Sequence, residues 1–211
     1  MVAATLTVDD LDVGSSKHPR RYTVDTLFEL PETEKRFEVL GGNLSVSPSA
    51  TPRHNRFLQQ LIVLFSGLLP PELAPLPDTA IRLPNGDGPV PDMLISSVDV
   101  DDYPRGIPAE LVYTVFEVVS PSNAYTDRKT KSDLYAEAGI LCYWRVEQRP
   151  WPEHFGPVPA IVVRLRDNDG EWQQTIAAAG AETELPIVVD ADGTIVTVTI
   201  DPATLVGRRS A

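Results

Sequence analysis

The chain has 211 residues, of which 42% are hydrophobic and 23% charged, and its formal net charge is -12. This length suits one domain with a single core, and the acidic balance disfavours tight binding to DNA through charge alone, because that affinity comes from Lys and Arg neutralising phosphates. No apolar run approaches the ~20 residues of a membrane helix, and the single cysteine, Cys142, excludes an internal disulfide and predicts a cytoplasmic location.

Strand-like and helix-like runs, separated by glycine and proline, follow one another along the chain. Helices are predicted where apolar residues recur at spacings of three and four, and strands where apolar or alternating runs end at turn residues. In chain order these patterns predict a helix over 25–30, strands over 35–40 and 43–47, a helix over 52–69, strands over 79–83, 90–96 and 111–119, a helix over 126–138, and strands over 140–146, 160–166, 171–176 and, in part, 187–200.

The order of these elements predicts an α/β protein. We expect a mixed central β-sheet flanked by helices, with an extra antiparallel hairpin at the C-terminal end. Residues 1–22 carry little periodicity, so a flexible N-terminal segment is predicted there, followed by a single domain over residues 23–205.

Two carboxylates are set into apolar strands. Glu117 ends the run 111–116, and Asp92 lies near the head of another predicted strand. A buried charge is costly unless a cation or a metal pairs with it. If the strands are neighbours, both carboxylates share one face and can hold Mg²⁺ or Mn²⁺, which prefer oxygen ligands. The alternative is that each carboxylate caps a turn or pairs with Arg82 or Arg128.

The helix after Glu117 offers a cation for such a site. Lys131 shares one helix face with Asp127 and Leu134, because these residues are three and four positions apart. Lys129 is the fallback, turned by about 200° from Lys131. The simpler alternative for Lys131 is a solvated side chain, and Asp127 is expected to cap the helix N-terminus.

These residues, in this order, resemble the PD-(D/E)xK nuclease superfamily. The similarity is carried by Pro91-Asp92, by the run 117–122 (EVVSPS), and by Asp127, Lys131 and the run 134–139 (LYAEAG). The chain is most similar to a bacterial family of restriction-endonuclease-like proteins. The resemblance implies a restriction-endonuclease-like fold and an Mg²⁺- or Mn²⁺-dependent endonuclease acting on DNA, as a homodimer.

The resemblance also implies roles for individual residues. The metal ligands would be Asp92, Glu117, the carbonyl of Val118, and Glu38 from the opening hairpin. The superfamily's lysine usually lies two residues beyond the glutamate, where this chain has Val119. In the family that this chain resembles, the lysine has moved to the next helix. The resemblance therefore points to Lys131 as the catalytic lysine beside Asp92 and Glu117.

Other interpretations stay open. The net charge and Val119 also fit a catalytically weak or inactive nuclease-fold module that serves regulation or assembly. A metal-dependent hydrolase acting on another ester is a third possibility, because fold does not determine function. His54, at the head of the long helix, is more simply a cap-region or hydrogen-bonding residue than a catalytic base. Trp144, Trp151 and Phe155 are candidates for exposed contacts between copies.

Overall fold

A computed structural model describes residues 22–31, 35–47, 49–167 and 169–207. The predicted flexible segment, 1–22, lies outside the described residues except for Tyr22, and the domain boundaries stay a prediction. The α-helices of these residues are α1 (Val24–Leu27), α2 (Pro52–Leu68) and α3 (Lys131–Glu137), with a π-helical turn (Thr126–Thr130) directly before α3. The strands are β1 (Arg36–Leu40), β2 (Asn43–Ser47), β3 (Ala74–Pro77), β4 (Ile81–Arg82), β5 (Met93–Ser96), β6 (Ile107–Pro108), β7 (Thr114–Val119), β8 (Cys142–Glu147), β9 (Ala160–Arg166), β10 (Trp172–Ala178), β11 (Thr183–Val188) and β12 (Ile195–Ile200).

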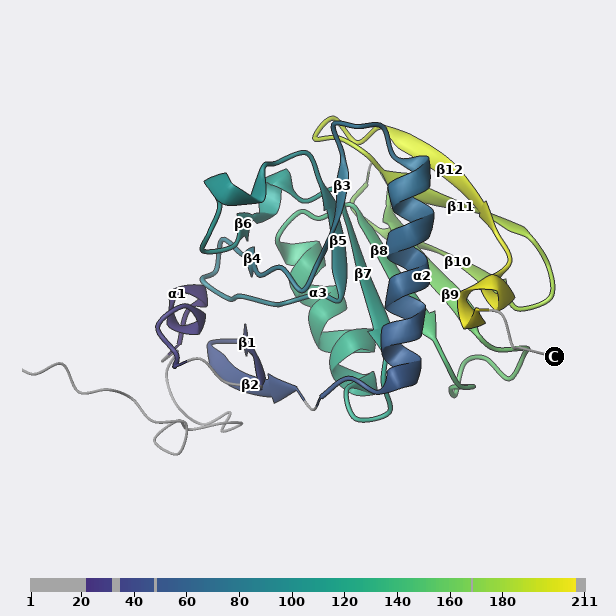
Figure 1. Cartoon of the computed structure of the whole chain (residues 1–211), viewed down its shortest axis with the longest axis horizontal. Helices are drawn as coiled ribbons and strands as arrows, with labels where there is room; N and C mark the ends of the chain where they lie inside the picture. Colours follow the sequence, from purple (N-terminus) through teal and green to yellow (C-terminus); the bar gives the residue numbers. More distant parts are fainter. Residues whose placement is uncertain (1–21, 32–34, 48, 168, 208–211) are drawn as a thin grey trace, which may run out of the picture.

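Within the described residues, six strands form one central mixed sheet in the order β10-β9-β8-β7-β5-β3 (Figure 1). Strands β7 and β8 are parallel, and the other neighbours are antiparallel. Because a parallel pair needs a crossover connection, the chain passes through α3 between β7 and β8. The predicted mixed α/β sheet and the antiparallel hairpin β11–β12 are both confirmed.

Helix α2 covers one face of the sheet. It begins at Pro52 because the Thr51 side chain accepts a hydrogen bond from the backbone N–H of His54, and proline is tolerated in the first turn. The ring of Phe65, on its inner side, packs 4.9 Å from the ring of Phe116 and 5.7 Å from that of Trp144. The hairpin β11–β12 extends the same core through Leu185, Ile187, Val198 and Ile200.

Helix α3 covers the opposite face (Figure 1). Its Leu134 and Tyr135 pack against Val115 and Tyr143 of the two parallel strands. Side chains alternate along a strand, so Glu117 points to the same face as Val115. The sheet therefore directs Glu117 towards α3 and away from the larger apolar core.

The hairpin β1–β2 is held against the segment that leads into β5. Gly41 and Gly42 adopt positive φ angles of 60° and 73°, which favours glycine at both positions. Their N–H groups donate to the buried carboxylate of Asp87, at 2.9 and 2.7 Å. Val39 and Gly88 also exchange two backbone hydrogen bonds. These contacts place the neighbouring Glu38 close to the segment that precedes the first residue of β5.

Three predictions about strands and exposed aromatic residues were wrong. The proline-rich residues Ala74–Pro77 form strand β3 at the edge of the sheet, where proline costs less because one side of the strand is unpaired. Of the strand predicted over 79–83, only the two-residue β4 forms, paired with β6. Trp144 and Trp151 are buried, whereas Phe155 is 85% exposed, so of the three aromatic residues only Phe155 lies at the surface.

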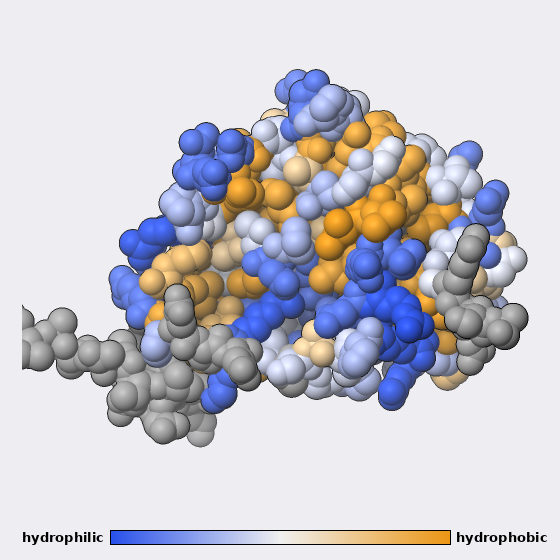
Figure 2. Space-filling model, viewed as in Figure 1, coloured by the Kyte–Doolittle hydropathy of each residue, from blue (hydrophilic) through white to orange (hydrophobic). Residues whose placement is uncertain are grey.

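Hydrophilic residues gather around the N-terminal end of α2 and between α2 and the hairpin β1–β2, whereas apolar residues surround the other end of α2 (Figure 2). In the part of the chain that the structure describes, no helix is both long and apolar enough to span a bilayer.

Candidate active site

Strands β5 and β7 bring the two predicted carboxylates together. Met93 pairs with Phe116 in antiparallel register, so the preceding Asp92 lies opposite Glu117. Both residues are buried, with Glu117 only 2% exposed. The backbone N–H of Val118 donates to Asp92 Oδ2 at 2.6 Å. Because the N–H and C=O of one residue in a strand point to the same side, the Val118 carbonyl also faces this site.

Lys131 lies between the carboxylates. Its Nζ is 2.8 Å from Glu117 Oε1, 2.7 Å from Glu38 Oε1 and 4.0 Å from Asp127 Oδ1. Lys131 is 3% exposed, whereas the side chain of Lys129 is 65% exposed and pairs with Asp133. Of the two lysines considered from the sequence, the fold therefore places only Lys131 in the site.

The π-helical turn before α3 helps to position Lys131. A π-turn widens the helix locally and leaves backbone carbonyls in need of partners, and such turns occur often at functional sites. The Tyr143 hydroxyl, on β8, donates to the Asp127 carbonyl at 2.7 Å. Asp127 is not the predicted N-cap, because its N–H already donates to the carbonyl of Asn123 and its side chain is buried. The helical backbone begins upstream, at residue 124.

Asp92 has two cationic partners that the sequence interpretation did not assign to it. Arg36 Nη1 donates to Asp92 Oδ1 at 2.9 Å, and His54 Nε2 lies 3.3 Å from the same oxygen. Arg36 is two residues before Glu38 on β1, so the alternation of a strand places both on one face; this signal was present in the sequence. His54 is a hydrogen-bonding residue near the helix cap, as expected.

The arginines that were considered as partners for the two carboxylates bind elsewhere. Arg82 pairs with Asp25 at 3.0 Å, and Arg128 pairs with Glu147 at 2.7 Å. The alternative in which Asp92 and Glu117 are paired by Arg82 or Arg128 was therefore wrong.

The carboxylates of the site differ in their affinity for protons. Burial alone would raise the pKa of Asp92, but the hydrogen bond and charge of His54, together with Arg36, lower it to about 2. Burial raises the pKa of Glu117 well above its usual range, and Lys131 opposes this only in part. Burial likewise raises the pKa of Asp127 to about 7.

The pKa values of Lys131, His54 and Tyr135 are all raised in the site. Burial would lower the pKa of Lys131, but the charges of Glu117 and Glu38 hold it above its usual range. Burial would also lower the pKa of His54, and its hydrogen bond with Asp92 raises it instead. Burial and the charge of Glu117 raise the pKa of Tyr135, so its hydroxyl stays protonated and donates to Glu117 Oε1 at 3.1 Å.

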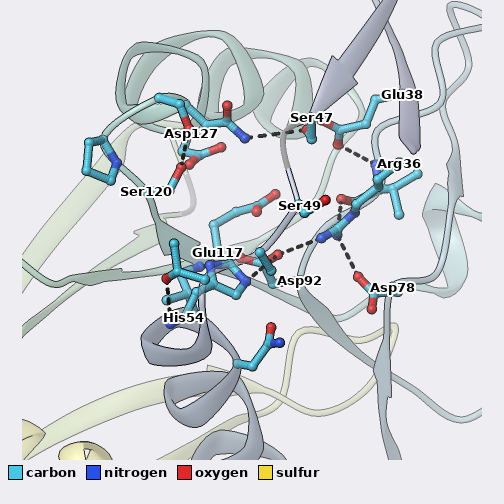
Figure 3. Close-up of a pocket in the computed structure, with 18 of the residues that line it drawn as sticks. Arg36, Glu38, Ser47, Ser49, His54, Asp78, Asp92, Glu117, Ser120 and Asp127 are labelled. Carbon is cyan, nitrogen blue, oxygen red and sulfur yellow. Dashed lines mark hydrogen bonds and ion pairs between the residues drawn. The ribbon is translucent and has the colours of Figure 1, made fainter. Parts of the chain in front are cut away.

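The carboxylates of the site, Lys131 and His54 line a cavity of about 620 Å³ (Figure 3), hereafter the acidic cavity. Its carboxylates are Glu38, Asp78, Asp92, Glu117 and Asp127, and its Lys and Arg side chains are Lys35, Arg36 and Lys131. With every group ionised, five negative charges face three positive ones, apart from His54. This excess of negative charge contributes to the raised pKa values of Glu117 and Asp127.

The donor set fits a hard divalent cation. Each carboxylate has about four lone-pair sites; among the described contacts, Glu117 accepts through Oε1, and Asp92 Oδ2 accepts one bond. Oxygen therefore remains available on both carboxylates, next to the Val118 carbonyl. No group of three or more His, Cys, Asp or Glu side chains within the described residues is arranged as a metal shell. Mg²⁺ usually needs only one or two carboxylates and keeps several waters.

The sheet order, the crossover helix and the buried carboxylate–lysine cluster define a restriction-endonuclease-like protein. The sequence model of the Uma2 family, described as “Putative restriction endonuclease”, matches residues 24–195. The chain belongs to this family, which confirms the resemblance seen in the sequence.

A solved structure from Anabaena variabilis ATCC 29413, described as a putative nuclease belonging to DUF820, has a similar fold with a TM-score of 0.61. The alignment covers 88% of this chain and 98% of that chain, at 15% sequence identity. An identity this low shows the fold alone. A comparison with curated proteins gives no significant match.

Proposed function

We propose that the protein is a divalent-metal-dependent endonuclease that hydrolyses phosphodiester bonds in DNA. The observation that carries the proposal is the ammonium of Lys131, buried between Glu117 and Glu38 at 2.8 and 2.7 Å and next to Asp92. A lysine held among carboxylates inside an open cavity is costly as a purely structural device, since buried ion pairs add little net stability. The family supports the nuclease assignment.

In this proposal Asp92, Glu117 and the Val118 carbonyl hold Mg²⁺ or Mn²⁺. When bound, the cation would offset charge on the phosphate and lower the pKa of water. Arg36 and His54 fix Asp92 from one side, at 2.9 and 3.3 Å from its Oδ1. Their hydrogen bonds keep the carboxylate ionised and leave its Oδ2 directed towards the Val118 backbone.

Lys131 is the proposed catalytic cation. Its ammonium would donate to the attacking water or to the phosphate oxygens as negative charge develops on them. Glu38 positions Lys131 through Oε1, which also accepts the N–H of Val90 at 2.8 Å. Any contribution of Glu38 to the metal shell would use its other oxygen. Tyr135 orients Glu117.

We also propose that the protein acts in the cytoplasm. We propose further that it is a homodimer, because cutting both strands of a duplex needs two sites. Light scattering coupled to size-exclusion chromatography measures the oligomeric state directly. A monomer that still linearises plasmid DNA in single binding events would contradict the dimer.

The test is cleavage of supercoiled plasmid and single-stranded DNA in Mg²⁺, Mn²⁺ or EDTA. We expect wild-type cleavage only with metal, and a loss of about 10²-fold or more in Glu117→Gln and in Asp92→Asn. Glu137→Gln is the matched control, because Glu137 is an exposed residue of the same helix as Lys131 and lies outside the acidic cavity. Equal cleavage by wild type and both site variants would rule out the assignment.

Calorimetric titration with Mn²⁺ separates the proposal from an inactive nuclease-fold module. We expect wild-type protein to bind the ion and Glu117→Gln to bind it more weakly. A wild-type protein that neither binds metal nor cleaves DNA would favour the regulatory or assembly module.

A further inference from the structure

A second cavity, of about 480 Å³, adjoins the acidic cavity. The two share Thr51, Ser120 and Pro121, so they lie side by side across the turn that ends β7. The second cavity is lined by the first turn of α2, the end of β8 and the turn before α3; its lining includes Arg53, Arg128, Glu147, Gln148 and Arg149. It is called the basic cavity below.

The charge of the basic cavity is opposite to that of its neighbour. Among the described residues that line it, three are arginines and Glu147 is the only carboxylate. That carboxylate is neutralised locally, because Arg128 Nε and Nη2 donate to its two oxygens at 2.9 and 2.7 Å. Arg145 Nε lies 3.9 Å from Glu147 Oε1 as a second cation. The basic cavity therefore carries a local excess of positive charge in a chain with a net charge of -12.

Two of the arginines remain accessible to a ligand. Arg53 and Arg149 are both exposed, and neither forms an ion pair among the described residues. Arg53 makes one long hydrogen bond, 3.5 Å to the carbonyl of Gln148, and its guanidinium lies over the Phe57 ring. Guanidinium groups bind phosphate in a bidentate manner and are weakly hydrated, which suits them to phosphate contacts.

We infer that the basic cavity binds a phosphate next to the scissile one on the same nucleic-acid strand, through Arg53 and Arg149. The inference rests on the proposed function, which places the scissile phosphate in the acidic cavity. The acidic cavity alone repels a polyanion, whereas an adjoining cationic cavity attracts its next phosphate. Two neighbouring sites of this kind select a polymer with successive phosphates over an ester with a single phosphate.

The experiment measures binding of a fluorescein-labelled single-stranded oligonucleotide by anisotropy in EDTA, at several salt concentrations. For Arg53→Gln/Arg149→Gln we expect affinity about tenfold lower and a salt slope smaller by about 0.7 for each phosphate that the protein no longer neutralises. Arg56→Gln/Arg105→Gln is the matched control, since it changes the net charge equally through two arginines outside both cavities. Its affinity should stay within twofold of wild type.

Equal affinities for the two double variants, or no binding by wild type, would overturn the inference. The proposed function is tested separately, by metal-dependent hydrolysis of bis(p-nitrophenyl) phosphate, which has one phosphate. If wild-type protein hydrolyses this diester and both double variants bind the oligonucleotide equally, the phosphate site in the basic cavity is ruled out and the nuclease assignment stands. If Arg53→Gln/Arg149→Gln alone loses binding and wild-type protein does not hydrolyse the diester, the phosphate site stands and the nuclease assignment is ruled out.

Discussion

The acidic and basic cavities meet at the end of β7, but their charged side chains differ in how far they are buried. In the acidic cavity Glu117 and Lys131 are 2% and 3% exposed, whereas Arg53 and Arg149 of the basic cavity are exposed. A buried charge depends on its partners for stability, but an exposed one is already solvated. Substitutions in the acidic cavity should therefore change folding and chemistry together, and those at exposed arginines should change binding alone.

The largest expected effect is that of Lys131→Met. It leaves Glu117 and Glu38 buried without their shared cation, which should lower the free energy of unfolding by about 3–5 kcal/mol. Cleavage should fall by about 10²- to 10³-fold. Urea unfolding followed by circular dichroism, together with plasmid cleavage, measures both.

A second substitution separates folding from chemistry. Lys131→Met/Glu117→Gln replaces one of the two buried carboxyl groups that lose their cation, so it should regain part of the stability and none of the cleavage. If Lys131→Met is as stable as wild type, the buried carboxylates do not depend on Lys131 for stability. The difference in stability that we expect between the two cavities would then be wrong.

Arg128 is the exception within the basic cavity, because its partner Glu147 is buried at 1% exposure. Arg128→Gln leaves that carboxylate with Arg145 alone, and should cost about 2 kcal/mol of stability. Chemical denaturation measures this cost, with Arg149→Gln as the exposed control. Equal stability of the two variants would mean that depth of burial does not separate the arginines.

The acidic cavity should also make stability depend on pH. Burial raises the pKa of Asp127 to about 7 in the folded chain, above its ordinary value of 3.8. The folded state therefore binds this proton more tightly than the unfolded state, and stability falls as the pH rises from about 4 to about 7. The slope from one group is at most about 1.4 kcal/mol per pH unit.

Asp127→Asn removes this titration. Denaturation in EDTA at several pH values between 5 and 8 should show a shallower loss of stability in Asp127→Asn than in wild type. Asp133→Asn, an exposed residue of α3, is the control and should follow the wild-type curve. A wild-type slope in Asp127→Asn would mean that another group carries the titration.

The smallest expected effect is that of Lys129→Met. Lys129 is exposed and pairs with Asp133 at 3.0 Å, four residues along the helix. Such pairs contribute about 0.3–0.5 kcal/mol, so stability and cleavage should stay close to wild type. Denaturation and plasmid cleavage, run beside Lys131→Met, measure both; a large loss of cleavage would reassign the catalytic lysine to Lys129.

Much of the fold could be predicted because its signals are local. The periodicity of α2 and the Gly41-Gly42 turn of the first hairpin each depend on a few neighbouring residues, and both were predicted correctly. Strand β3 was missed because its prolines oppose strand formation unless the strand lies at an edge, and edge position depends on sheet order.

In the candidate site, too, some residues could be predicted from local patterns and others could not. Asp92, Glu117 and Lys131 could be selected because each departs from its local pattern or matches the order of a known family. The alternation of β1 indicates that Arg36 shares a face with Glu38. The contacts of Arg36 and His54 with Asp92 could not be predicted, because they span 56 and 38 residues of the chain. Asp127 was expected at the helix N-terminus because the sequence does not reveal where a helix with a π-turn begins.

Local sequence patterns were enough to predict the long helix α2, the strands β5, β7 and β8 of the central sheet, and the family to which the chain belongs. The folded chain shows which charges are buried together, that Lys131 faces Glu117 and that a basic cavity adjoins the acidic one. The two differ because helix and strand patterns depend on neighbours only a few residues apart in the chain. The depth and pairing of a charge depend on segments brought together by the whole sheet.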